Sequence, residues 1–251
     1  MTAAIDLNCD MGEGMGDDAA LMPLVTSANV ACGFHAGGPE AMRRTVRLAR
    51  EHGVAVGAHP GFPDRAGFGR RLLAASPDEV RDDVTYQIGA LWAFCRAEGV
   101  PLAHVKAHGA LYNASADDPE LARAICEAAR AVDPALTVVC LARTPMVEVA
   151  RALGVPVAEE AFADRAYTPA GRLVSRRSPG AVLRDPAEVA ARVSLLARER
   201  RVVAVDGTAV SIDARTVCVH GDTPGAARLA AVIRERLRAD GVRVEPLARP
   251  G

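Results

Sequence analysis

Hydrophobic and polar positions along this chain follow two rhythms that alternate from end to end. Short apolar runs with a period of two predict strands, and longer stretches with apolar residues three or four positions apart predict helices. Strands are expected over residues 3–9, 28–34, 54–59, 102–107, 137–141, 155–158 and 217–220. Helices are expected over residues 40–51, 77–98, 119–132, 145–153, 186–198 and 225–237. An irregular stretch over 162–179 and a hairpin within 202–212 interrupt this order.

One expected helix has particularly well-marked ends. Ser76 is a favoured N-cap residue, Pro77 suits the first helical position, and two acids follow in the first turn. Its apolar stripe is formed by Val80, Val84, Ile88, Leu91, Trp92 and Cys95. The pattern therefore predicts one long helix with a single face against the core, ending at Gly99.

The order of the elements indicates the fold class. Repeated β-α units with short links imply an α/β protein with a parallel sheet. About seven such units occur in 251 residues, without a linker or a break in composition. These features favour a single domain over residues 1–251, built as a distorted TIM-like (β/α) barrel, and leave an open doubly wound sheet as the alternative.

Five of the expected strands carry apolar residues on one face and polar residues on the other. Side chains alternate faces along a strand, so every second residue shares a direction. The apolar sets can pack against outer helices, which leaves the polar sets pointing inward. The inward sets are Asp6, Asn8 and Asp10; Asn29 and His35; His59; Lys106 and His108; and Cys218, His220 and Asp222.

An inward ring of charged and amide groups is not an ordinary barrel core, because burying a charge without a partner is costly. In β/α barrels the carboxyl ends of the strands meet at one face, where barrel enzymes place their catalytic groups. One shared site is therefore expected there, containing Asp10, His35, His59, Lys106, His108 and His220. His52 is expected on a helix surface, and His104, at the start of its strand, is expected far from this face.

Lys106 is the only lysine among 30 basic residues, so the other 29 are arginine. It shares a strand face with His108. An ammonium is a compact point charge whose pKa shifts readily on burial, whereas a guanidinium is a planar fork. A site that binds a small oxyanion, or uses a neutral amine, needs the former. Lys106 is therefore a catalytic candidate, and the alternative is one surface lysine without a function.

Composition narrows the range of functions. The net charge of −1 gives no electrostatic basis for binding nucleic acid or an anionic membrane. No apolar run approaches the roughly 20 residues of a membrane-spanning helix. The six cysteines are scattered without a C-x-x-C pair, as is typical of reduced thiols. With no secretory leader visible, a cytoplasmic location is expected.

Motifs for several common activities are absent. The chain has no G-x-x-x-x-G-K-[ST] phosphate loop, no G-x-S-x-G nucleophile elbow and no H-E-x-x-H metal motif. The segment 12–16 indicates a tight turn or mobile loop. A divalent metal on the polar cluster is chemically possible, but the spacing does not indicate one. Arg70, after Gly67-Phe68-Gly69, is placed to present its guanidinium to an anion.

Seven blocks of sequence carry a resemblance to a known family. They begin at Asp6 (DLNCDMGEG), Ser27 (SANVACGFHAG), Gly57 (GAHPGFPD), Gly67 (GFGRR), Val105 (VKAHGALYN), Phe162 (FADRAY) and Val217 (VCVHGDTP). Together they resemble the LamB/YcsF family over essentially the whole chain. The family often has Pro where this chain has Ala107, a position expected to face the outer helices.

The resemblance implies a barrel like that of glycoside hydrolases and polysaccharide deacetylases. It also implies the role of the A-type subunit in prokaryotic ATP-dependent 5-oxoprolinase. In that reaction the lactam of 5-oxo-L-proline is hydrolysed to L-glutamate, ATP is the cofactor, and two further subunits, of types B and C, are the partners. Which of the three phosphorylates the lactam stays open.

This chemistry suggests roles for the polar residues. Asp10 or Asp6 is expected to act as general base, with a pKa raised by burial in the cavity. Lys106 and the histidines are expected to stabilise anionic oxygens. The expected catalytic residues are Asp10, His59, Lys106 and His108; the substrate-binding residues are Asp6, Asn8, Asn29, His35, Asp164, Arg165 and His220; and the cofactor-binding residue is Arg70.

Two other functions fit the same residues. The first is a metal-dependent deacetylase or amidohydrolase that acts without ATP. The second is a non-catalytic subunit that binds 5-oxoproline. Stoichiometric metal with activity in the absence of partners would favour the first, and tight binding without a loss of rate in a His108→Ala complex would favour the second.

Overall fold

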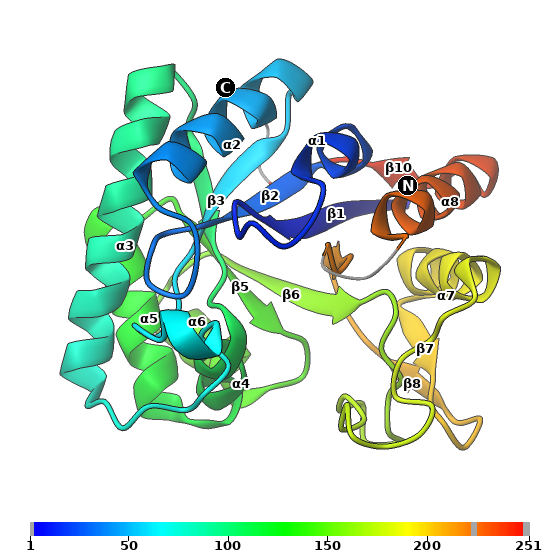
Figure 1. Ribbon diagram of the computed structural model, residues 1–251. Coiled ribbons are helices and arrows are strands. Elements are labelled where there is room, and N and C mark those ends of the chain that lie inside the picture. The colour runs from blue at the N-terminus through cyan, green and yellow to red at the C-terminus, as the bar shows by residue number, and fades with distance from the viewer. Residues whose placement is uncertain (1–2, 222–224, 248–251) are drawn as a thin grey trace.

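Seven parallel strands close into a barrel in the computed structural model, which describes residues 3–221 and 225–247 (Figure 1). The strands are β1 (Ala4–Met11), β2 (Ser27–Ala31), β3 (Ala55–His59), β4 (Leu102–Val105), β5 (Thr137–Leu141), β6 (Val157–Phe162) and β9 (Thr216–Cys218). Strand β1 pairs with both β2 and β9, and β9 pairs with β6, so the ring is closed. The predicted barrel is confirmed, and the open doubly wound sheet is excluded.

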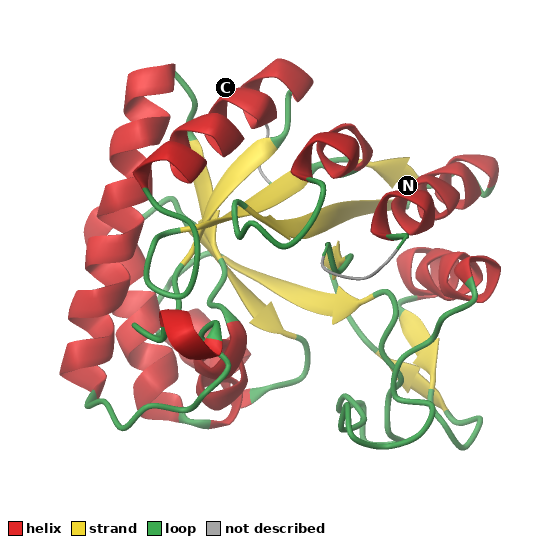
Figure 2. Ribbon diagram, viewed as in Figure 1, coloured by secondary structure: helices red, strands yellow, loops and turns green. Residues whose placement is uncertain are grey.

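Helices surround the barrel, as Figure 2 shows. They are α1 (Asp18–Leu21), α2 (Pro39–His52), α3 (Pro77–Glu98), α4 (Gly109–Asp117), α5 (Pro119–Val132), α6 (Pro145–Ala152), α7 (Pro186–Glu199) and α8 (Ala226–Ala239). Short 3₁₀ turns cover Met22–Leu24 and Arg65–Gly67. The hairpin of β7 (Arg201–Val203) and β8 (Ala209–Ser211) lies outside the ring, and β10 (Arg243–Val244) extends it beside β1. No helix of the described residues is both long and apolar enough to cross a membrane.

Helix α3 begins and ends where the sequence indicates. The Ser76 hydroxyl accepts from the backbone N–H of Glu79, and the Glu79 carboxylate accepts from that of Ser76, which forms a capping box. Gly99 ends the helix in the left-handed conformation, with φ 67°. Trp92 was expected in the buried stripe but is 44% exposed and lies beneath Arg96. The buried face is therefore narrower than the apolar pattern suggests.

The polar faces of the strands do point into the barrel. Asn8 of β1 donates from Nδ2 to Glu160 of β6 at 2.8 Å and to Thr216 of β9 at 2.7 Å. Because β9 separates β1 from β6 in the sheet, the Asn8–Glu160 bond must cross the interior. The opposite faces carry Leu7, Cys9, Val30, Val56 and Val105, which are all buried in the hydrophobic core. The interior therefore holds a polar network, and the apolar core lies between the strands and the helices.

His104 points inward from β4 (Leu102–Val105). It is buried inside the barrel, where Nε2 donates to Oδ1 of Asn29 at 2.7 Å. Burial lowers the pKa of His104 to about 3, so the ring is neutral. Gly57 on β3 makes room for this ring, since a Cβ there would lie 2.1 Å from Nε2. His104 is thus joined to the polar network through Asn29, whereas His52 is exposed on α2 as expected.

Candidate active site

A cavity of about 470 Å³ opens at the carboxyl ends of the strands. Asp10, His59 and Lys106 lie at its inner end, on β1, on β3 and just beyond β4. Its remaining walls include His108, Tyr112, Phe162, Arg165, Arg176 and His220. Five of the six residues predicted to share one site line this cavity, namely Asp10, His59, Lys106, His108 and His220, and His35 does not. Asp222 from the same prediction lies outside the described residues.

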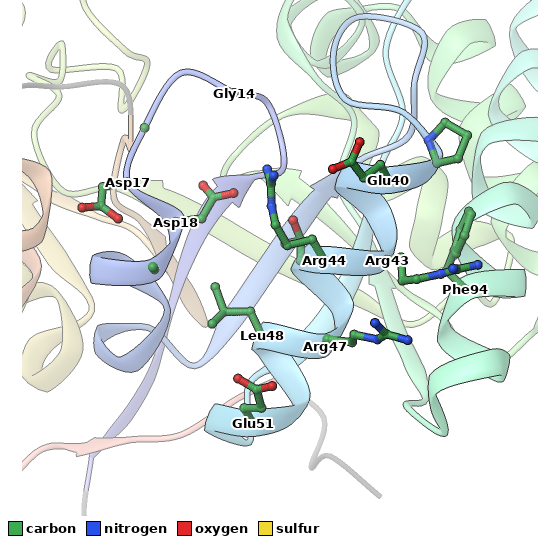
Figure 3. A pocket seen from close by; sticks show the side chains of 14 residues that line it. Gly14, Asp17, Asp18, Glu40, Arg43, Arg44, Arg47, Leu48, Glu51 and Phe94 are labelled. Atoms are coloured by element: carbon green, nitrogen blue, oxygen red, sulfur yellow. The ribbon is translucent and has the colours of Figure 1, made fainter.

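A larger depression of about 1020 Å³ lies on the outside of the barrel (Figure 3). Its walls are α2, the loop before α1 and Phe94 of α3. The charged residues that line it are Asp17, Asp18, Glu40, Arg43, Arg44, Arg47 and Glu51. These side chains carry both signs of charge, and no buried catalytic group faces them. We therefore place the site in the smaller cavity, where buried titratable groups converge.

Lys106 is the centre of the buried network. Its ammonium lies 2.9 Å from Oε1 of Glu160 and 3.1 Å from Oδ1 of Asp10. It also lies 3.1 Å from Oδ1 of Asn8 and 3.2 Å from Sγ of Cys218. Burial lowers the pKa of Lys106, but the neighbouring negative charges outweigh burial and hold it well above its usual value. The only lysine of the chain is therefore a buried, permanently charged ammonium and not a neutral amine.

Asp10 faces the cavity from the end of β1. Its Oδ1 accepts hydrogen bonds from Lys106 and from Nδ2 of Asn29, and its Oδ2 lies 3.4 Å from Nε2 of His59. Burial raises the pKa of Asp10, but the charges of His59 and Lys106 outweigh burial and hold the pKa well below its usual value. The expected raised pKa is therefore wrong in direction, because the sequence does not reveal that Asp10 lies between two basic groups.

Glu160 of β6 lies across the barrel interior from Asn8 of β1. It is fully buried, and its two oxygens accept from Asn8, from Lys106 and, at 2.6 Å, from the hydroxyl of Tyr112. Glu160 was not predicted as a site residue, because the expected strand ends at residue 158, whereas β6 continues to Phe162. The period-two alternation from Ala158 carries the signal, since it places Glu160 on the inward face.

Three histidines and one glutamate gather beside the cavity, and two of them, His59 and His108, line it. The rings of His35 and His108 are stacked with their centroids 3.7 Å apart. Oε1 of Glu13 lies 3.0 Å from Nε2 of His35, 3.2 Å from Nδ1 of His108 and 3.7 Å from Nε2 of His59. Glu13 was missed because it lies in a glycine-rich turn, where no periodicity indicates a direction. We call Glu13, His35, His59 and His108 the histidine cluster.

Glycines allow the two stacked rings to approach each other. A Cβ at Gly61 would lie 2.9 Å from Nδ1 of His35. A Cβ at Gly69, whose φ is 63°, would lie 2.8 Å from both His35 and His108. The glycines of the two sequence blocks that begin at Gly57 and Gly67 therefore shape the cluster as well as the turns.

A second group of linked, charged side chains lies at the mouth of the cavity. His220 lies 2.8 Å from Oδ1 of Asp164 through Nδ1, and Nη2 of Arg176 donates to its Nε2 at 2.7 Å. Arg165 is buried and donates to the carbonyl of Val174 at 2.6 Å. Arg70 also lines the cavity, with its guanidinium 5.1 Å from the centre of the Phe68 ring. The mouth is therefore rich in arginine, which suits an anionic ligand.

Known sequences resemble this chain over almost its whole length. Residues 5–250 match the LamB/YcsF family. The chain belongs to the LamB/YcsF family. A family member from Agrobacterium fabrum, named as the first A-type subunit of 5-oxoprolinase, is 51% identical over 98% of both chains. Another from Rhodopseudomonas palustris, also named as the A-type subunit of 5-oxoprolinase, is 52% identical over 97% of this chain and 98% of its own.

A solved structure of a similar protein has the same fold. The crystal structure of a lactam utilization protein from Thermus thermophilus matches this chain with a TM-score of 0.93 and 51% sequence identity. The match covers 96% of this chain and 99% of that one. The two chains therefore share the fold over almost their whole length.

Asp6 occupies a different position from the other predicted site residues of this LamB/YcsF member. It is buried below the cavity, where its carboxylate accepts from the hydroxyls of Thr26, Ser27 and Thr216 at 2.5–2.7 Å. Burial raises its pKa to about 6. Its neighbours are three hydroxyls of the barrel floor, and it does not line the cavity. The contacts of Asp6 are therefore structural.

We expect Asp6 to make folding pH-dependent. A carboxyl group with a raised folded pKa binds its proton in the folded state first, so its contribution to stability rises as the pH falls through about 6 and levels off below the unfolded value. Relative to Asp6→Asn, the wild type should gain about 1–2 kcal/mol in free energy of unfolding between about pH 8 and about pH 4.5. Urea unfolding of both proteins across this range measures the difference. A pH-independent difference would show that the carboxyl group is not perturbed.

Proposed function

We propose that this protein is the A-type subunit of an ATP-dependent 5-oxoprolinase, which opens the lactam of 5-oxo-L-proline to give L-glutamate. The observation that carries the proposal is the cavity itself, in a family whose members are named for this activity. It combines an ionised Asp10, a buried ammonium and an arginine-rich mouth. Its volume of about 470 Å³ is enough for a small anionic substrate.

The reaction requires activation before water attacks. A lactam is a resonance-stabilised amide, and transfer of phosphate from ATP to its oxygen makes the ring carbon electrophilic. Water then adds to that carbon and loses a proton to a base. The carbon–nitrogen bond breaks, with the nitrogen taking a proton, and a second water releases phosphate from the acyl group. The products are glutamate, ADP and phosphate.

The residues of the cavity match the needs of this sequence. Asp10 is ionised and faces the cavity, so its Oδ2 can accept the proton of the attacking water. A carboxylate with a low pKa is a weak base, so transfer to it relies on the strong electrophile that phosphorylation creates. Lys106 holds Asp10 in place and supplies positive charge beside the reacting carbon. Arg165 and Arg176 suit the carboxylate or phosphate of the substrate.

Partner subunits are part of this proposal. The chain has no phosphate-binding loop, and its single lysine is committed to two carboxylates inside the barrel. Lys106 is therefore not available to bind a triphosphate in the manner of a P-loop lysine. We assign ATP binding chiefly to the other two subunits, of types B and C, and keep Arg70 as the group of this chain that would contact the phosphate.

We expect the isolated chain to form almost no glutamate from 5-oxoproline, with or without ATP. Addition of the partner subunits should restore glutamate formation in step with ADP release, because activation and hydrolysis are divided between chains. The measurement is a coupled assay of glutamate and ADP with each subunit omitted in turn, and boiled chain as control. Full ATP-coupled turnover by the purified single chain would contradict the division. ATP-independent, metal-dependent hydrolysis would instead favour an amidohydrolase.

A further inference from the structure

The hydrogen bonds around the histidine cluster fix which ring nitrogens carry protons. Nδ1 of His59 lies 2.7 Å from the carbonyl oxygen of Lys106, and Nε2 of His108 lies 2.8 Å from that of Phe68. A carbonyl only accepts, so both of these nitrogens must donate. If both rings are neutral, the remaining nitrogens, Nε2 of His59 and Nδ1 of His108, present lone pairs, and they lie only 3.0 Å apart. Two neutral rings cannot satisfy each other in this arrangement.

The surrounding charge is negative. Oε1 of Glu13 lies 3.2 Å from Nδ1 of His108, and Oδ2 of Asp10 lies 3.4 Å from Nε2 of His59. The ammonium of Lys106 forms ion pairs with Asp10 and Glu160. Glu13 has histidines as its partners. The cluster therefore places two facing ring nitrogens beside two carboxylates, and a cation between the rings, either a proton or a metal ion, would satisfy both.

We propose that the histidine cluster binds one divalent transition-metal ion of the zinc class. The ligands would be Nε2 of His59, Nδ1 of His108, Oε1 of Glu13 and Nε2 of His35, whose donor atoms all lie within 4.8 Å of one another. Metal–nitrogen bonds of about 2.05 Å in a tetrahedron place neighbouring donors about 3.3 Å apart. The three distances from Glu13 to the histidines, 3.0, 3.2 and 3.7 Å, bracket this value. Imidazole-rich sites with one carboxylate suit zinc, cobalt or nickel.

The hydrogen bonds of the rings resemble those of metal sites in general. Ligating histidines usually donate their second nitrogen to a carbonyl or carboxylate, which orients the ring. His59 and His108 do so through Lys106 and Phe68. Nδ1 of His35 is buried without a hydrogen-bond partner, so His35 is the least restrained of the three. Because His59, His108 and Asp10 line the cavity, an ion on this cluster would lie at its edge and could bind an oxygen of the substrate.

The test uses the isolated wild-type chain and requires neither ATP, 5-oxoproline nor partners, so its failure is separate from that of the proposed function. The chain is purified without a histidine tag, stripped with a chelator and titrated with ZnCl₂ and with CoCl₂. We expect one equivalent of zinc by elemental analysis, and visible absorption typical of low-symmetry Co²⁺. Anomalous diffraction from a zinc-soaked crystal should place the ion between His59 and His108.

Variants locate the site. Glu13→Gln and His59→Ala should each weaken zinc binding by roughly 100-fold or more, because each removes a direct ligand. His52→Ala, a histidine exposed on α2, is the matched control and should bind zinc as the wild type does. If a variant fails to fold, the zinc titration of the stripped wild type still tests the proposal.

Three results would overturn the proposal. One is the absence of stoichiometric zinc or cobalt binding by the folded, stripped wild type. Another is binding that the cluster variants leave unchanged. The third is ring ¹⁵N chemical shifts showing His59 or His108 doubly protonated at about pH 8 and unaffected by zinc. In that last case a proton, and not a metal ion, would join the two rings.

Discussion

Replacing Lys106 by methionine in the assembled complex is expected to reduce glutamate formation by at least about 10²–10³-fold, the usual effect of removing a buried electrostatic stabiliser. The change also leaves Asp10 and Glu160 without their shared cation. Loss of one partner from a buried ion pair costs about 3–5 kcal/mol, so the free energy of unfolding should fall by a similar amount. Lys106→Arg is expected to behave alike, because a planar guanidinium does not fit between the two carboxylates.

A double variant separates stability from catalysis. Adding Glu160→Gln to Lys106→Met removes the second negative charge, so much of the lost stability should return while activity stays low. Denaturant unfolding and the coupled glutamate assay, run on the same preparations, measure both. Turnover near the wild-type rate in the stable double variant would remove Lys106 from the catalytic residues and leave it as a structural cation.

Asp10→Asn in the complex is the second large expected effect, with glutamate release falling by about 10²–10⁴-fold. The amide has the shape of the carboxylate. Its oxygen can still accept from Lys106 and Asn29, and its Nδ2 would replace Oδ2 beside Nε2 of His59. The fold should therefore be retained, whereas an amide cannot take a proton from water. Single-turnover assays with ATP and partners would measure the loss.

Glu51→Gln is the matched control for Asp10→Asn. Glu51 lies on α2 at the outer depression and makes no contact with the cavity (Figure 3). Like Asp10→Asn, the Glu51→Gln substitution removes one negative charge. Because Glu51 lies away from the cavity, this variant should keep the wild-type rate. If Asp10→Asn gives glutamate as fast as this control, then Asp10 is not the base, although the proposed division between subunits would stand.

The alternation of residues predicted the barrel and much of its polar interior, because a period of two requires no knowledge of neighbours. It placed Asp10, His59, Lys106 and His108 on inward faces, and the structure brings them together at one cavity. It did not predict the contact of Glu13 with three histidines, since a turn has no period. It also gave the wrong direction for the pKa of Asp10, which depends on groups 49 and 96 positions away along the chain.

The sequence also did not predict how deep each inward-facing residue lies within the barrel. Asp6 and Asp10 share a strand face, yet one lies among hydroxyls of the floor and the other faces the cavity. Their separation along β1 is only four residues, and alternation treats them as equivalent. Which end of an inward row reaches the ligand depends on the register between strands, and the register follows from tertiary contacts.

The closure of β1 against β9 has a consequence for biosynthesis. Bonds such as those from Asn8 and Asp6 to Thr216 join residues 208 and 210 positions apart. Strand β1, which leaves the ribosome first, therefore cannot complete the hydrogen bonds of its polar face until β9, one of the last strands, has been made. Contacts of such long range form late and slowly. A nascent chain that ends before β9 has an open sheet edge on β1 and leaves acids and amides of its inward face without their partners.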